Sequence, residues 1–271
     1  MFQQWSGKEY RVAPFYQPAA FAGRPSDTVC HTLVDMSSAG EIAVRWRAVR
    51  ARVDELARNA GRSPDDVRLI AVSKTHPVEA VAAAVATGQR DFGENTMQDA
   101  LTKIPRFAGQ GLTWQFIGNL QSNKAKFLPG NFHWWHSLNS AALAERVSRL
   151  AAEKNATIYA LIEINITRDP AKHGVLPDAL DALLEELLKK ELPGLRLRGL
   201  MAMGPQGAHE KEIRAAYAAL RDLRDTVRAR YALPGFSELS MGMSGDYAEA
   251  IREGSAMIRI GTAIFGEREY T

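Results

Sequence analysis

The chain has 271 residues, of which 46% are hydrophobic and 24% charged, a composition typical of a globular protein with a sizeable core. A net charge of +3 with no long basic run argues against nucleic-acid binding, and no apolar run approaches the ~20 residues that cross a bilayer. The single cysteine, Cys30, excludes a disulfide within the chain and argues against a cysteine-based zinc site. The expected location is the cytoplasm.

Residues 1–36 differ from the rest of the chain. They mix aromatic residues, Pro and Gly without helical or strand periodicity, and they lack the continuous apolar stretch of a secretory signal. We expect an N-terminal extension that is loosely ordered or draped on the surface; an extra strand or helix packed on the main domain is the alternative. Residues 37–271 are expected to form that domain, with Ser37 or Ser38 as the cap of its first helix.

Past the extension, a first helix begins near Glu41, and short apolar strands then alternate with helices. The predicted strands are residues 67–73, 90–93, 113–117, 132–136, 157–164, 196–202, 237–241 and 257–261. The predicted helices between them are residues 77–86, 95–103, 121–127, 140–154, 177–190, 208–230 and 245–252. Eight such units predict an α/β fold, a single TIM-type (β/α)8 barrel. An open doubly wound sheet is the alternative, but no G-x-G-x-x-G motif follows the first strand.

A barrel of this type carries its active site where the strands end, so the residues at those ends are the candidates. Lys74 directly follows the first apolar strand and should lie at the barrel mouth. Partial desolvation there favours the neutral, nucleophilic amine, which can form a Schiff base with an aldehyde. An ordinary surface lysine at a strand end is the alternative interpretation.

Two small turns follow the last two strands, where barrels often hold phosphate. The first contains Ser244 and the second contains Gly261 and Thr262, and their backbone N–H and hydroxyl groups can bind an anion. Ordinary tight turns are the alternative. Arg259 lies in an apolar strand and needs a buried partner, either a structural one or the pyridine nitrogen of a cofactor.

The histidines do not form a metal constellation. His133 and His136 should point to opposite faces of one strand, so no shared metal is expected. The chain also has no G-x-S-x-G elbow, no Walker loop and no H-E-x-x-H motif.

The strand-end motifs, taken in order, resemble those of one family. The matching stretches are LIAVSKTHP (69–77), DFGENTMQ (91–98), WQFIGNLQSNK (114–124), LIEINI (161–166), LRGLMAM (197–203), LSMGMSGDYAEAI (239–251) and IRIGTAIFGERE (258–269). From about Ile42 to Tyr270 the chain resembles the pyridoxal phosphate homeostasis proteins, also called the YggS/PROSC family. Their barrel is similar to the N-terminal domain of alanine racemase, a fold-type III arrangement, without the second β domain.

The resemblance implies a cofactor, pyridoxal 5′-phosphate (PLP), held on Lys74 as a Schiff base. It places Ser244, Gly261 and Thr262 on the phosphate side, and it sets Arg259 against the pyridine nitrogen, where a second positive charge is disfavoured. The expected cofactor-binding residues are Lys74, Asn95, Met203, Ser240, Ser244, Arg259, Gly261 and Thr262.

The function implied is intracellular PLP homeostasis: binding PLP and supplying it to apo forms of PLP-dependent enzymes, without catalysis beyond imine formation. A monomer is expected, since no second domain demands a partner. The alternative is a small PLP-dependent amino acid racemase with Lys74 as one base and Lys172 or His173 as the other. A protein-interaction module that retains the barrel is a third possibility.

The sequence departs from the family at four positions. His76 stands where the family usually has lysine, Thr96 where it has tyrosine, Gln115 where it has histidine, and Gly204 where proline is common. These departures put in doubt any secondary PLP contact through residues 76 or 96.

Overall fold

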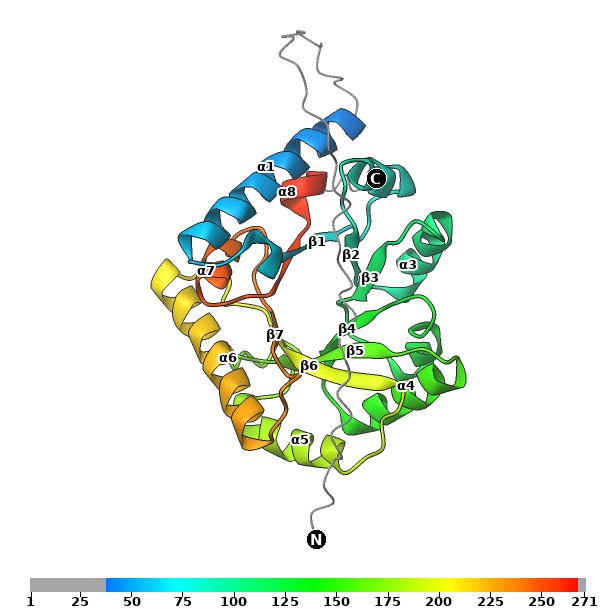
Figure 1. Cartoon of the computed structure of the whole chain (residues 1–271), viewed down its shortest axis with the longest axis vertical. Coiled ribbons are helices and arrows are strands. Elements are labelled where there is room, and N and C mark those ends of the chain that lie inside the picture. The colour runs from blue at the N-terminus through cyan, green and yellow to red at the C-terminus, as the bar shows by residue number, and fades with distance from the viewer. Residues whose placement is uncertain (1–37, 268–271) are drawn as a thin grey trace. The chain divides into compact units, whose positions relative to one another are not determined.

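The computed structural model describes residues 38–267, and these residues form a closed barrel of eight parallel strands in chain order (Figure 1). The strands are β1 Arg68–Val72, β2 Asp91–Glu94, β3 Thr113–Phe116, β4 Trp134–Leu138, β5 Ile158–Ile164, β6 Leu195–Ala202, β7 Glu238–Ser240 and β8 Met257–Ile260. The predicted TIM-type barrel is therefore confirmed. The prediction for residues 1–36 lies outside the described residues.

Helices surround the strands in Figure 1 and follow them along the chain. They are α1 Ser38–Asn59, α2 Val78–Ala86, α3 Met97–Lys103, α4 Ala141–Glu153, α5 Leu180–Leu188, α6 Glu210–Arg230, α7 Tyr247–Arg252 and α8 Thr262–Phe265. Among residues 38–267, no helix is long and apolar enough to cross a membrane.

Several predicted elements need correction. Residues 177–190 form a 3₁₀ helix, Pro177–Ala179, followed by α5, and α8 was not predicted. The predicted helix at residues 121–127 is a 3₁₀ helix, Ser122–Phe127. The predicted strand at residues 132–136 begins two residues later, since Phe132 forms only an isolated bridge with Pro129 before β4 begins.

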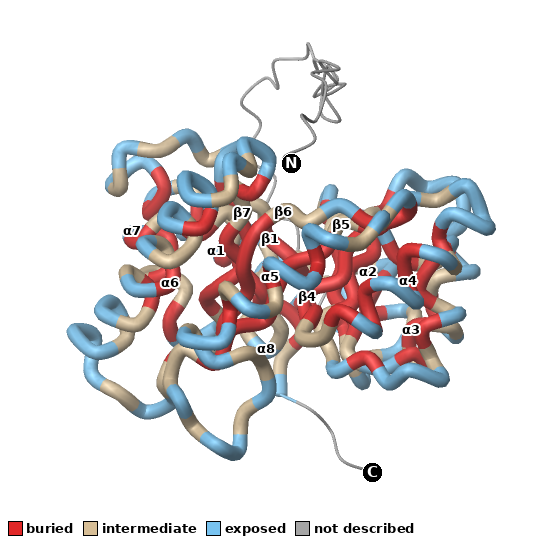
Figure 2. Tube along the Cα trace, turned by 90° about the horizontal axis from the view of Figure 1, so that it is seen from below, coloured by how far each residue is buried: buried red, intermediate tan, exposed pale blue. Residues whose placement is uncertain are grey.

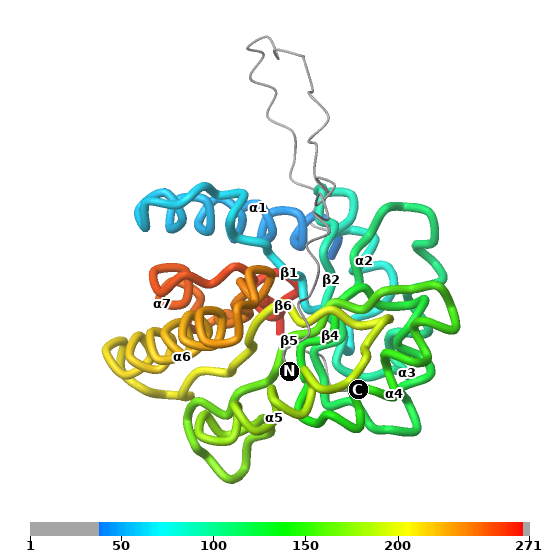
Figure 3. Tube along the Cα trace, turned by 60° about the horizontal axis from the view of Figure 1, so that its bottom comes forward, coloured from blue at the N-terminus to red at the C-terminus, as the bar shows by residue number. Residues whose placement is uncertain are grey.

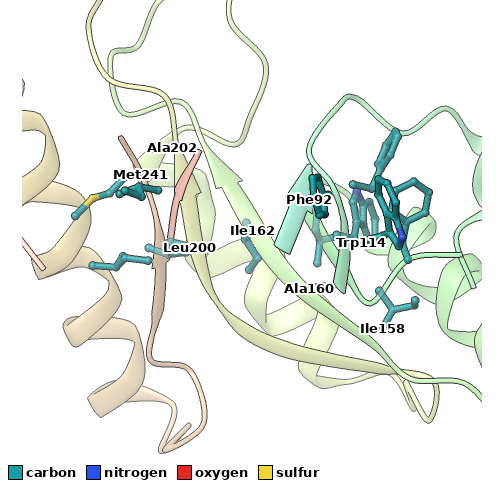
Figure 4. Close-up of a cluster of buried hydrophobic side chains, with 14 of the residues drawn as sticks. Phe92, Trp114, Ile158, Ala160, Ile162, Leu200, Ala202 and Met241 are labelled. Atoms are coloured by element: carbon teal, nitrogen blue, oxygen red, sulfur yellow. The ribbon is translucent and has the colours of Figure 1, made fainter. Parts of the chain in front are cut away.

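The strands are buried on both faces, which is why they read as nearly continuous apolar runs. Alternate residues face outward and pack under the helices, and Figure 4 shows part of this layer. Its labelled members are Phe92, Trp114, Ile158, Ala160, Ile162, Leu200, Ala202 and Met241. A second, smaller cluster fills the barrel interior from the other face of the strands, and comprises Ile70, Trp134, Leu161, Met201 and Met257. Figure 2 shows buried residues concentrated in the strands and exposed residues on the outer sides of the helices.

Strand pairing brings the predicted site segments together. Because the strands are parallel, all their carboxyl ends lie at one end of the barrel, and β1 closes the ring beside β8. Ala71 pairs with Ile260, and the N–H of Arg259 donates to the carbonyl of Gly242 at 3.0 Å. The chain path in Figure 3 shows β1 next to the red C-terminal segment. The turns after β7, β8 and β1 are thus consecutive neighbours.

Candidate functional site

Lys74 lies in the turn that leaves β1, where it is half-buried. The side chains of Ile70 and Val72 face the barrel interior, because both would contact a Cβ added to Gly93 on β2. Lys74 lies two residues after Val72. Because side chains alternate between the two faces of a strand, we expect the Lys74 side chain on the same, inward side. A Cβ added to Gly261 would lie 3.3 Å from the carbonyl oxygen of Val72, so the backbone after β8 packs closely against this end of β1.

The turn after β7 is shaped by glycine and anchored by a carboxylate. Gly242 has φ +95°, and a Cβ there would lie 2.6 Å from the Cβ of Ala250, so the turn accepts only glycine without a shift. Asp246 accepts hydrogen bonds from the Met243 N–H at 2.6 Å and from the Tyr217 hydroxyl at 2.7 Å. These bonds fix the turn and leave Ser244 exposed beside it.

The turn after β8 leads directly into α8, which begins at Thr262. The Thr262 side chain is exposed, and the first N–H groups of a helix have no acceptor within it. Gly261 and Thr262 therefore offer N–H and hydroxyl donors next to the Ser244 turn. This donor set suits an anion such as phosphate.

Arg259 supplies a buried positive charge below these turns. It is 5% exposed and donates to Ser240 Oγ at 2.6 Å and to the carbonyl of Ala202 at 3.1 Å. Burial lowers the pKa of Arg259, an effect opposed by the nearby Tyr217, Asp246 and Glu163. The guanidinium still remains charged, since arginine does not lose its proton in proteins.

A chain of hydrogen bonds continues from Ser240 through the barrel interior. His136, fully buried, contacts Ser240 Oγ through Nδ1 at 3.0 Å and Gln115 Oε1 through Nε2 at 2.8 Å. The Gln115 amide N–H donates to Asp91 Oδ1 at 2.8 Å. We call this chain, Arg259–Ser240–His136–Gln115–Asp91, the interior relay.

The donors of the interior relay have a defined direction. Because Gln115 turns its N–H to Asp91, its oxygen must accept from the Nε2–H of His136. Nδ1 of His136 then accepts from the Ser240 hydroxyl, which in turn accepts from Arg259. Burial, together with Arg259 and Arg68, keeps the pKa of His136 well below its usual value, so the ring is neutral as this arrangement requires.

Sequence reasoning did not place Gln115 and His136 in the site. His133 and His136 lie in different surroundings. His133 is exposed and its Nδ1 accepts from the Trp114 N–H at 3.2 Å, whereas His136 is fully buried. Within residues 38–267, no group of three potential ligands could hold a metal. The signal for the relay was a polar residue at an inward position of an apolar strand, as in Trp134–Leu138.

The other predicted residues also lie at strand ends. Asn95 follows β2 and Met203 follows β6, and both are half-buried. Lys172 donates from Nζ to the carbonyl of Gly204 at 3.0 Å, and His173 is exposed. The structure thus brings the predicted cofactor-binding residues to one end of the barrel. Lys172 is hydrogen-bonded to the loop after β6.

Comparison with known proteins places this barrel in a family. Residues 44–269 match the family model described as the N-terminal domain of alanine racemase. The pyridoxal phosphate homeostasis protein of Pseudomonas aeruginosa is 43% identical over 229 residues, which cover 84% of this chain and 96% of that protein. The chain belongs to the pyridoxal phosphate homeostasis protein family. The protein of that name from Escherichia coli is 39% identical over 241 residues, 85% of this chain and 98% of its own length.

Solved structures agree with this assignment. PipY of Synechococcus elongatus, a structure with PLP bound, is 37% identical, with a TM-score of 0.73 over 83% of this chain and 100% of PipY. Alanine racemase from Clostridium difficile is 13% identical, with a TM-score of 0.65 over 85% of this chain and 57% of the racemase. The racemase likeness shows the barrel fold alone. The predicted resemblance to the pyridoxal phosphate homeostasis protein family is confirmed.

The departures from the usual residues of the pyridoxal phosphate homeostasis protein family have local structural roles. His76 stacks on Phe265 of α8 at 5.0 Å between ring centroids, and Thr96 caps α3 by accepting from the Asp99 N–H at 3.4 Å. A Cβ on Gly204 would lie 2.7 Å from the Tyr217 hydroxyl. Glycine at position 204 therefore accommodates the hydroxyl that anchors the turn after β7.

Gly118 makes a close approach that any side chain would disturb. A Cβ there would overlap the carbonyl oxygen of Asn95, the predicted site residue at the end of β2. We expect Gly118→Ala to lower the free energy of unfolding by about 2–3 kcal/mol, as in an overpacked core. Gly245→Ala is the matched control, because nothing lies within 4 Å of its Cβ position. Urea unfolding of both variants would measure this, and equal stability would contradict the predicted clash.

Glu94 at the end of β2 predicts a pH effect on stability. Its side chain is fully buried, and burial raises its pKa from 4.5 to about 7, although Lys103 and Ser73 oppose the rise. Between these two pH values the unfolded chain has released the proton while the folded chain retains it. Raising the pH therefore favours unfolding, by up to about 3 kcal/mol from this group.

Glu94→Gln removes this titration. The stability of the variant relative to the wild type should rise by about 2.5 kcal/mol between pH 5 and pH 8. Measuring the difference between the two proteins at each pH cancels the other titrating groups. A difference that does not change with pH would show that Glu94 ionises normally.

Proposed function

We propose that this chain binds PLP at the carboxyl end of the barrel and holds it in reserve for PLP-dependent enzymes. Membership of the pyridoxal phosphate homeostasis protein family supports the proposal, as does the likeness to PipY with PLP bound. The observation that carries it is the convergence of an amine, a pair of donor-rich turns and a buried guanidinium at one end of the barrel, contributed by Lys74, by the turns after β7 and β8, and by Arg259.

The residues present fit the cofactor. PLP supplies an aldehyde that condenses with amines and a phosphate dianion. Lys74 would hold the aldehyde carbon covalently, and the cradle at Ser244, Gly261 and Thr262 would hold the phosphate. A Cβ on Gly242 would meet Ala250, and one on Gly261 would meet the Val72 carbonyl, so glycine at these positions lets the two turns pack closely at this end of the barrel.

The remaining predicted residues complete the site. Arg259, held by Ser240 and the Ala202 carbonyl, would present its charge to the pyridine nitrogen. Asn95 and Met203 would line the pocket from β2 and β6. We propose the domain to be residues 37–271 and the protein to act as a monomer in the cytoplasm.

We propose a carrier in preference to a racemase. A two-base racemase needs a second acid–base group across the cofactor from Lys74. Of the two candidates, Lys172 is bonded to the Gly204 carbonyl and His173 is exposed to solvent. Neither arrangement favours a base directed at a substrate, so we propose no catalysis beyond covalent capture of the aldehyde.

The experiment loads the purified chain with PLP, removes free PLP by gel filtration, and adds a PLP-free enzyme. The expected result is retained PLP that restores activity to the recipient. The same loaded protein is then tested for loss of deuterium from the α-carbon of several amino acids. Failure to retain PLP would overturn the proposal, and exchange at ~1 per second or faster would replace the carrier with an enzyme.

A further inference from the structure

The residue after Lys74 has an unfavourable backbone conformation. Thr75 has φ +66°, in the left-handed region that β-branched residues rarely adopt and that costs about 1–3 kcal/mol. Its N–H donates to Asp99 Oδ2 of α3 at 2.7 Å. This strained conformation therefore has a specific partner on the neighbouring helix.

The residue before Lys74 is held as well. Ser73 is fully buried, and its hydroxyl donates to Glu94 Oε1 at 2.7 Å. The carbonyl of Ser73 accepts from Lys103 Nζ at 2.7 Å. Both neighbours of Lys74 are thus bonded to side chains from β2 and α3.

Lys103 joins these contacts. It lies at the end of α3 but is only 2% exposed, although a lysine in the last turn of a helix normally reaches solvent. Its ammonium donates to Glu94 Oε1 at 2.9 Å and to Asp99 Oδ2 at 2.9 Å, in addition to the Ser73 carbonyl. A lysine ammonium has three N–H donors, so the three acceptors match its full capacity.

Burying this ammonium has a cost that hydrophobic packing would avoid. Replacing a buried ion cluster by apolar residues is often neutral or stabilising, so a buried cluster is weak evidence for a purely stabilising role. In the described part of the chain, Glu94 Oε2 also remains buried without a hydrogen-bond partner. The cluster of Glu94, Asp99 and Lys103 is therefore better explained by a role in fixing the turn at residues 73–75, to which it is bonded.

We propose that Glu94, Asp99 and Lys103 form a clamp that sets the direction of Lys74 at the barrel mouth. The inference rests on the proposed function of Lys74 as the PLP-binding amine. Lys103 and Glu94 fix the chain before Lys74, and Asp99 fixes the strained peptide after it. These are positioning residues, since they act through the backbone of the turn and not on the cofactor.

Asp99 offers the sharpest test, because it is partly exposed and its loss should leave the fold intact. Asp99→Ala removes the acceptor of the Thr75 N–H, whereas Asp99→Asn keeps an oxygen in the same place. Gln98→Ala, at an exposed position of the same helix turn, controls for general weakening of α3. The rate of covalent capture is followed with PLP and with pyridoxal, which lacks the phosphate.

Asp99→Ala should slow capture of both aldehydes about 10-fold or more, because a misdirected amine loses its alignment with the carbon it attacks. Hydrogen exchange of the Thr75 amide should accelerate in the same variant. Asp99→Asn and Gln98→Ala should stay within about 3-fold of the wild type, since each retains an acceptor for Thr75.

The outcomes separate the clamp from the proposed function. Capture by the wild type and by Asp99→Ala at equal rates would overturn the clamp alone. An equal loss in Asp99→Asn and Asp99→Ala would also overturn it, since charge and not the bond to Thr75 would then matter. Failure of the wild type to capture PLP would overturn the proposed function and the clamp with it.

Discussion

Lys74→Ala is expected to abolish covalent capture of PLP and to weaken its retention by about 100-fold or more, a loss of about 3 kcal/mol. The variant keeps the donors of Ser244, Gly261 and Thr262, so the phosphate can still bind. It lacks the amine that holds the aldehyde carbon. Equilibrium dialysis would give the retention, and visible absorbance would report the covalent bond.

The control for this prediction is Lys189→Ala. Lys189 is exposed at the end of α5, so its removal changes the number of lysines without changing the barrel mouth. This variant should bind PLP like the wild type. If Lys74→Ala retained both the absorbance and the affinity, another amine would have to be the site.

Gln115→Leu is expected to break the interior relay and lower the free energy of unfolding by about 3 kcal/mol. Leucine fills a similar volume, but it leaves the buried Nε2–H of His136 without an acceptor. Asp91 Oδ1 loses the Gln115 amide and keeps Arg68 at 3.7 Å. Each buried polar group left unpaired costs about 1–3 kcal/mol. Chemical denaturation would measure the change.

Gln115→His is the matched control, because it replaces one polar side chain by another that can both donate and accept a hydrogen bond. An imidazole can accept from His136 and donate to Asp91, so the loss should stay below about 1.5 kcal/mol. A Gln115→Leu variant as stable as the wild type would show that the relay bonds contribute nothing. A Gln115→His variant as unstable as Gln115→Leu would point to packing instead.

Much of the barrel could be predicted because burial on both faces leaves a simple pattern. Residues 69–72 are apolar throughout, Ile158–Ile164 is interrupted only by Tyr159 and Glu163, and a helical stretch follows each run along the chain. The start of β4 was misplaced because Phe132 is apolar and buried but packs in the outer core before the strand pairing begins. Local hydrophobicity cannot distinguish a buried aromatic residue within a strand from one that packs in the core just before the strand.

The site residues could be predicted only where a reactive or anion-binding residue comes soon after the end of a strand. Lys74 and the turn at Gly261 and Thr262 are of this kind. The interior relay joins Gln115, His136 and Ser240 from three different strands, and its bonds depend on barrel closure and register. The clamp on Thr75 depends on a positive φ and on a lysine that folds inward, and neither feature is visible in residue type alone.

The most direct test of the account is to reduce the PLP-loaded wild-type protein with borohydride and locate the modified residue by peptide mass spectrometry. Reduction fixes the bond between an amine and the cofactor aldehyde, so the modified residue is the one that held PLP. We expect one modified lysine, Lys74. Modification of Lys172 or of an exposed lysine, with Lys74 unmodified, would contradict it.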